Sequence, residues 1–136
     1  MAPDHIEALP VRATYAQLLA DSEDFAGSVI AYEDLLPAAL RIWGPDHLGS
    51  LMIRGCLAEA RVRRDGAPAD GLIDFAGLVD DCLRVLGPGR YVTEATLAFR
   101  DALRESGPAL PSTAYGELLE QYGKAERSGR ATPTAG

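Results

Sequence analysis

The sequence predicts an all-α protein built from repeated helix pairs, about three pairs and six helices in all. Three observations lead to this fold class. Apolar residues recur at spacings of three and four instead of alternating, glycine and proline divide the chain between these stretches, and distant segments resemble one another at a fixed distance. The 136 residues are enough for one compact domain with a hydrophobic core.

Two segments carry the helical pattern most clearly. Five apolar residues form a stripe in each, and the two stripes are Val29, Tyr32, Leu36, Leu40, Trp43 and Leu72, Phe75, Val79, Cys82, Leu86. Between them and around them lie shorter, less apolar helices. In chain order we expect helices at Val11–Asp21, Asp24–Trp43, Gly49–Arg64, Ala69–Leu86, Val92–Ser106 and Ser112–Arg127.

Glycine followed by proline separates the predicted helices, because glycine ends a helix and proline cannot continue it. These breaks are Gly44-Pro45, Gly66-Ala67-Pro68, Gly87-Pro88 and Gly107-Pro108. The predicted organisation is an N-terminal extension at 1–10, a repeat domain at 11–127 and a flexible tail at 128–136, whose Ser, Thr, Gly and Pro residues bury too little surface to fold.

The chain contains an internal repeat with a spacing of 43 residues. The pattern LRxxGP at Leu40–Pro45 returns at Leu83–Pro88, and Tyr32 matches Phe75. A third partial copy, Ala114–Leu119, matches Ala31–Leu36. The intervening helices match as well, but two registers remain open for the last of them: Arg54 lies opposite either Arg100 or Leu97.

These residues resemble a known family. Helix pairs of roughly 42 residues that end in LRxxGPDH and continue into a Ser/Thr-Leu-x-x-Arg helix start are similar to the long tetratricopeptide repeats of kinesin light chains and many bacterial regulators. The best match is Gly44–His47 with Ser50–Arg54. The resemblance covers roughly 11–127, although Pro88-Gly89-Arg90 has lost the Asp-His pair.

The resemblance implies an antiparallel helix-pair solenoid whose first helices line a concave surface. Stacking is also expected on physical grounds, because one helix pair cannot cover its own apolar face. Peptide-binding members of the family carry an Asn two positions after the helix-start Arg, where this chain has Thr14, Cys56 and, in one register, Ala102. The departure puts a kinesin-type peptide groove in doubt.

Arg12, Arg54 and Arg61 are the predicted partner-binding residues, since guanidinium groups on a concave face suit an acidic partner. The competing interpretation is that these arginines, with Arg100, pair with acids on neighbouring helices. The run Arg61–Arg64 is better explained by its place in the last turn of a helix, where cations are favourable, than as a polyanion site.

Residues that carry catalysis in other proteins are few here. Cys56 and Cys82 are expected to be buried apolar groups rather than nucleophiles. His5 and His47 lack the spacing of metal ligands, and His47 is expected to cap or pack in its turn. We therefore predict no catalytic residue, no metal and no cofactor.

The composition of the chain argues against some classes of binding partner. A net charge of −7 argues against nucleic acid and anionic membranes, and no run of apolar residues is long enough to cross a bilayer. The start of the chain does not resemble a signal peptide, which favours the cytoplasm, and the preference for Arg over Lys suggests a GC-rich, bacterial source.

The leading hypothesis is a non-catalytic adaptor that binds a protein or peptide through its concave surface. The alternative is a small helical accessory enzyme or ligand-binding protein of a biosynthetic pathway, with a pocket near Tyr32, Cys56 and Tyr91. A third possibility is a self-associating regulator, because the first helix lacks the charged outer face that the last helix has.

Overall fold

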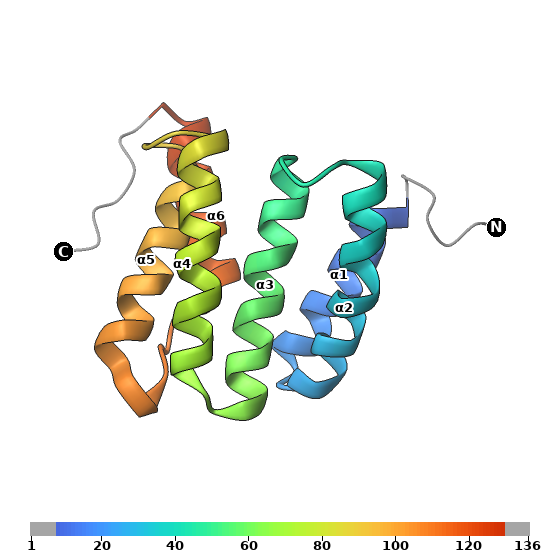
Figure 1. Cartoon of the computed structure of the whole chain (residues 1–136), viewed down its shortest axis with the longest axis vertical. Helices are drawn as coiled ribbons and strands as arrows, with labels where there is room; N and C mark the ends of the chain where they lie inside the picture. The colour runs from blue at the N-terminus through green and yellow to red at the C-terminus, as the bar shows by residue number, and fades with distance from the viewer. Residues whose placement is uncertain (1–7, 130–136) are drawn as a thin grey trace. The chain divides into compact units, whose positions relative to one another are not determined.

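A computed structural model describes residues 8–129. Helices make up 82% of them, and this part of the chain contains no strand, so the all-α prediction is confirmed. The six α-helices are α1 (Ala8–Asp21), α2 (Phe25–Ile42), α3 (Leu48–Asp65), α4 (Pro68–Val85), α5 (Tyr91–Ser106) and α6 (Tyr115–Arg127), with a short 3₁₀ helix at Gly107–Ala109 (Figure 1).

The helices fall into two compact units, and the boundary lies between Asp65 and Gly66. In the first unit α2 packs against both α1 and α3 (Figure 1). Its core joins Leu9 and Ala16 of α1, Val29 and Leu35 of α2 and Leu57 of α3, all of which are buried. The side chain of Asp24 caps α2 by accepting a hydrogen bond of 3.0 Å from the Gly27 N–H.

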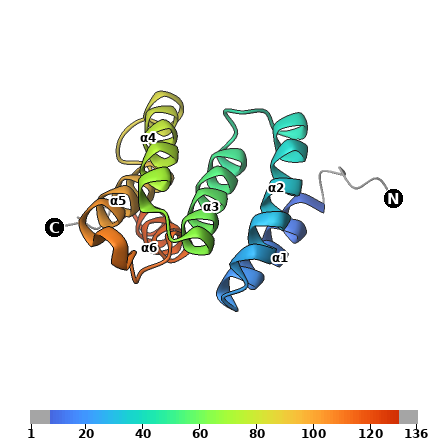
Figure 2. The ribbon, with the colours of Figure 1, turned by 60° about the horizontal axis from the view of Figure 1, so that its bottom comes forward.

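In the second unit α5 packs against both α4 and α6 (Figure 2). Its core centres on three aromatic rings, one from each helix. Phe75 and Phe99 lie 5.0 Å apart, and Tyr115 meets them edge-on at 5.5 and 5.9 Å. The hydroxyl of Tyr115 is 2.8 Å from that of Thr96, so this buried polar group has a partner.

Residues that match in the internal repeat of the sequence are also buried or exposed to a similar extent in the structure. Buried positions of α2 match buried positions of α4 at the 43-residue spacing: Tyr32/Phe75, Leu35/Leu78 and Ala39/Cys82. Exposed apolar positions match too. Ile30 and Ile73 are 68% and 71% exposed, and Leu40 and Leu83 are 37% and 40% exposed.

The ends of α2 and α4 repeat in the same way. Trp43 and Leu86 hold almost the same backbone angles, φ −96° and −101°, and each N–H bonds back into the last turn of its helix. The next residues, Gly44 and Gly87, have φ of 89° and 81°, which only glycine adopts readily. The predicted helix-ending role of these glycines is confirmed.

The helix starts favour one of the two registers left open. Leu48 begins α3 and Tyr91 begins α5, 43 positions later. Ser50 and Thr93, also 43 apart, are both fully buried. This register places Leu97, rather than Arg100, opposite Arg54.

Three details differ from the expectations. Leu40, assigned to the apolar stripe, is exposed, because Ala39 occupies the buried side of the helix there. Helix α1 begins at Ala8, so Pro10 lies in its first turn, where a missing N–H costs no helical bond. The third copy is shortened: Tyr115 begins α6, whereas its counterpart Tyr32 lies in the middle of α2.

Candidate functional site

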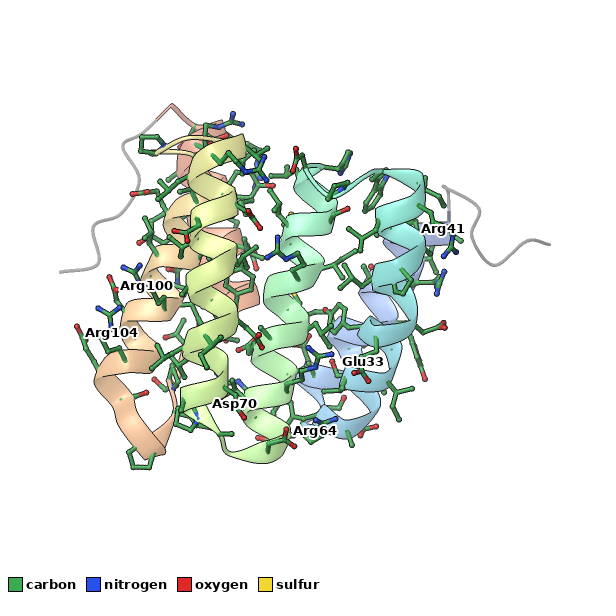
Figure 3. All side chains as sticks on the ribbon, viewed as in Figure 1. Glu33, Arg41, Arg64, Asp70, Arg100 and Arg104 are labelled. Carbon is green, nitrogen blue, oxygen red and sulfur yellow. The ribbon has the colours of Figure 1, made fainter. Side chains whose placement is uncertain are left out.

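Arg12 and Arg61, two of the predicted partner-binding residues, pair with neighbouring acids of α2. One nitrogen of Arg12 lies 2.9 Å from the Asp34 carboxylate and 3.1 Å from the Asp34 carbonyl. Arg61 lies 2.9 Å from Glu33, which Figure 3 labels on α2. Asp34 thus faces α1, and the preceding residue, Glu33, faces α3. These pairs hold the guanidinium groups at the surface of the first unit.

Arg54, the third predicted partner-binding residue, lies on α3, is half-buried and interacts with neighbouring groups. In the second unit Arg100 bonds the adjacent Asp101 at 3.0 Å. Arg104 follows one turn later and projects from the same side of α5 (Figure 3). Arg12, Arg61 and Arg100 therefore each have an acidic partner close by.

The basic run at the end of α3 is neutralised locally. Arg63 bonds Glu59, one turn earlier, at 3.0 Å, as the spacing predicts. Arg64 bonds the next residue, Asp65, at 2.7 and 2.9 Å. The hydrogen bonds from Arg64 lower the pKa of the Asp65 carboxyl below its ordinary value. This arrangement suits a helix end more than a polyanion site.

A partly exposed polar cluster joins α1, α2 and α3 in the first unit. The Tyr32 hydroxyl donates to Gln17 Oε1 at 3.3 Å, and the Gln17 amide donates to Asp21 at 2.9 Å. The hydroxyl also interacts with the Cys56 thiol of α3, one turn before the carboxylate of Glu59. Two residues of the alternative pocket hypothesis, Tyr32 and Cys56, are thus brought together.

In this cluster the pKa values of Cys56 and Tyr32 are raised. Burial, together with the negative charge of Glu59, raises the pKa of the Cys56 thiol to about 12. Burial raises the pKa of the Tyr32 hydroxyl as well, with Cys56, Glu59 and Asp21 adding to the shift. A thiol that stays protonated near neutral pH is a poor nucleophile. Cys56 and Tyr32 therefore act here as hydrogen-bonding groups.

Tyr91, the third residue of the pocket hypothesis, belongs to the second unit. Its N–H donates to the Glu126 carboxylate at 2.8 Å, and Arg90 bonds the same carboxylate at 3.3 Å. Burial opposes ionisation of Glu126, but these two donors outweigh it and lower its pKa. Glu126 thus serves the N-terminus of α5, where a negative charge is favourable. No spacing rule links residues 35 positions apart, so the sequence did not reveal this contact.

His47 packs and caps in the turn between α2 and α3, as expected. Its ring stacks on Trp43, with centroids 4.6 Å apart and planes 12° apart. Its Nδ1 accepts a hydrogen bond of 2.9 Å from the Gly49 N–H, one of the free donors at the start of α3. The other histidine, His5, lies outside the described residues.

The buried polar contacts of the second unit were also not predicted from the sequence. Thr96 donates to its own helix at the Val92 carbonyl, contacts Tyr115, and lies 4.0 Å from the Cys82 sulfur. Within residues 8–129 no group of three or more His, Cys, Asp or Glu side chains is placed to hold a metal ion. None of the described helices combines the length and apolar character of a membrane span.

Searches of protein-family models, of curated proteins and of solved structures found no match to this chain. The tetratricopeptide resemblance therefore stays a prediction from the repeat pattern.

Proposed function

We propose that this chain is a non-catalytic helical-repeat adaptor, which binds a protein or peptide segment through a concave surface lined by the first helix of each pair. The observation that carries the proposal is that Arg12 of α1 and Arg61 of α3, both on first helices, reach the surface of the first unit although each is paired with an acid of α2. Single exposed apolar side chains are ordinary in proteins. The exposed apolar residues that the second helices share, Ile30 with Ile73 and Leu40 with Leu83, lie outside the proposed surface and do not bear on the proposal.

The arginines of the first helices supply the polar part of the contact. On α3, Arg61 uses one nitrogen in its ion pair with Glu33, and its guanidinium group carries further N–H donors that could bind a ligand. Arg61 remains 41% exposed. A carboxylate of the partner then competes with, or joins, the acids of α2. Arg54 and Arg61 are the residues that we assign to the partner, with Arg12 third.

The experiment begins with the wild-type chain, which is used to capture partners from an extract of its source cells. Each partner identified is then titrated by calorimetry against the wild-type chain and two matched double variants. Arg54→Ala/Arg61→Ala should weaken binding by about ten- to a hundredfold, since each lost charge-assisted bond contributes about 1.5 kcal/mol. Arg41→Ala/Arg84→Ala, with the same loss of charge on the second helices, should change it less than about threefold.

The control residues suit the comparison because Arg41 and Arg84 are both exposed and lie at matching positions of the repeat. Unchanged affinity of the Arg54/Arg61 variant would reject the assignment of these arginines. Loss of binding in the Arg41/Arg84 variant alone would place the contact on the second helices and reject the concave-surface proposal.

A further inference from the structure

The sequence contains two Asp-Gly dipeptides, Asp65-Gly66 and Asp70-Gly71. In such a pair the backbone nitrogen of glycine can attack the Cγ carbon of the aspartate side chain, because glycine has no Cβ to hinder the approach. The reaction closes a succinimide ring, and it requires rotation about the ψ angle of the aspartate. The local structure therefore decides which of the two pairs reacts.

Asp65-Gly66 lies at the end of a helix, where this rotation is easiest. Asp65 is the last residue of α3, so its carbonyl is among those that a helix end leaves without an intrahelical partner. Gly66 follows with a φ of 62°, and a Cβ added to it would meet nothing within 4 Å. The Asp65 side chain is 48% exposed. Rotation about its ψ angle disturbs only the end of α3, and both reacting groups are accessible.

Asp70-Gly71 has the same chemical groups in the opposite setting. Both residues lie near the start of α4, which begins at Pro68, and Figure 3 labels Asp70 on this helix. Gly71 is buried, and its N–H donates to the Ala67 carbonyl at 3.4 Å. Rotation about the ψ angle of Asp70 would break this bond and displace the helix that follows. Helix α4 therefore protects Asp70-Gly71 from ring closure.

The guanidinium group of Arg64 opposes the reaction at Asp65. Its Nε and Nη2 lie 2.7 and 2.9 Å from the two carboxylate oxygens. These bonds lower the pKa of the Asp65 carboxyl, and the ionised carboxylate is the less reactive form because ring closure has to expel one oxygen as water. Both side chains are exposed, so water competes with the ion pair. Arg64 therefore slows the reaction without preventing it.

We propose that Asp65-Gly66 is a site of spontaneous aspartate isomerisation, which is favoured by the end of α3 and slowed by Arg64. In the first step the Gly66 nitrogen forms a bond to Asp65 Cγ and loses its proton. The bond between Cγ and the hydroxyl oxygen of the protonated carboxyl breaks, and one water molecule leaves.

In the second step water adds to one of the two carbonyl groups of the ring. Addition at the main-chain carbonyl of Asp65 breaks its bond to the Gly66 nitrogen, which stays joined to Cγ. The product is an isoaspartyl link with one extra backbone carbon and an unchanged mass. This link lies at the boundary of the two compact units. The inference is independent of the adaptor proposal, because it concerns the backbone of the chain alone.

Prolonged incubation of the full folded chain at mildly acidic pH, followed by peptide mapping, tests the proposal. Electron-transfer fragmentation distinguishes isoaspartyl from aspartyl peptides, although their masses are equal. In the folded chain isoaspartate should form at Asp65 at least about fivefold faster than at Asp70, the factor that the loss of one backbone hydrogen bond represents. In urea neither pair is held by a helix, so the two rates should become similar.

Matched variants identify the residues responsible. Asp65→Glu keeps the charge but requires a larger ring, so it should abolish the isomerised product, whereas Asp70→Glu should leave the rate at Asp65 unchanged. Arg64→Gln should raise that rate about two- to fivefold, as expected for the loss of one exposed ion pair. Far-UV circular dichroism confirms that each variant is folded.

Two results would overturn the selection of this site by the end of α3. One is an equal or faster reaction at Asp70 in the folded chain. The other is the absence of isoaspartate at Asp65 in the folded chain after a time in which the sample in urea forms it. An unchanged rate in Arg64→Gln would overturn the protective role of Arg64.

Discussion

Gly49→Ala is the substitution whose effect the structure defines most sharply. Gly49 lies in the first turn of α3, directly beneath the ring of Trp43. A methyl group added there would overlap Trp43 Cζ3 and lie 2.7 Å from Cε3, well inside van der Waals contact. Either the tryptophan ring or the start of α3 has to move, and the stack of Trp43 on His47 is lost if the ring rotates.

Two opposing effects set the magnitude. Alanine favours a helix over glycine by about 0.5–1 kcal/mol. Overpacking of this kind costs about 1–3 kcal/mol. The clash therefore dominates, and we expect Gly49→Ala to lower the free energy of unfolding by about 1–2 kcal/mol. Gly77→Ala, on an exposed face of α4 with nothing within 4 Å of the new methyl group, should instead raise it by about 0.5–1 kcal/mol.

Urea unfolding followed by far-UV circular dichroism measures both effects. The repeat supplies a further control, because Leu86 and Val92 occupy the positions that match Trp43 and Gly49. Val92 is fully buried there, so a larger residue fits when leucine replaces tryptophan. In a Trp43→Leu background Gly49→Ala should cost less than about 0.5 kcal/mol, and the difference is the coupling energy between the two sites.

Two results would refute this reasoning. One is a Gly49→Ala protein at least as stable as the wild type, with unchanged emission from Trp43, the single tryptophan of the chain. The other is an equal loss of stability in the Trp43→Leu background, which would place the cost in the backbone of α3 rather than in the aromatic ring.

Three further predictions concern buried and charged groups. Cys56, with its thiol pKa raised to about 12, should react with iodoacetamide at neutral pH much more slowly in the native chain than in urea; equal rates would contradict the burial argument. Thr96→Val should cost about 1 kcal/mol by removing the 2.8 Å contact with Tyr115, whereas an unchanged unfolding midpoint would show that this contact contributes nothing. The pKa of Glu126 is lowered in the folded chain, so at acidic pH the folded state binds fewer protons at this residue than the unfolded state does. The contribution of Glu126 to the free energy of unfolding is therefore present above the ordinary Glu pKa of about 4.3 and is lost as the pH falls below that value. In Glu126→Gln the free energy of unfolding should therefore fall less steeply as the pH is lowered. An unchanged dependence on pH would contradict this assignment.

Much of the helical structure was predictable because it depends on neighbours in the sequence. Periodicity over three and four residues located all six helices, and glycines with positive φ ended α2 and α4 where proline followed. The start of α6 was less predictable, because Ala114 rather than Ser112 precedes its first turn and no side chain caps it. The candidate arginines were identified as well, together with the competing interpretation that they pair with acids.

The sequence by itself determined the helices and their 43-residue repeat, because spacing along one chain controls both. Only the tertiary structure decided which charges meet, as with Arg12 and Asp34 across 22 residues or Tyr91 and Glu126 across 35. It also decided that Val11, Tyr15 and Leu18 of α1 face solvent. An apolar residue is buried or exposed according to which helix packs on it, and periodicity does not identify that neighbour.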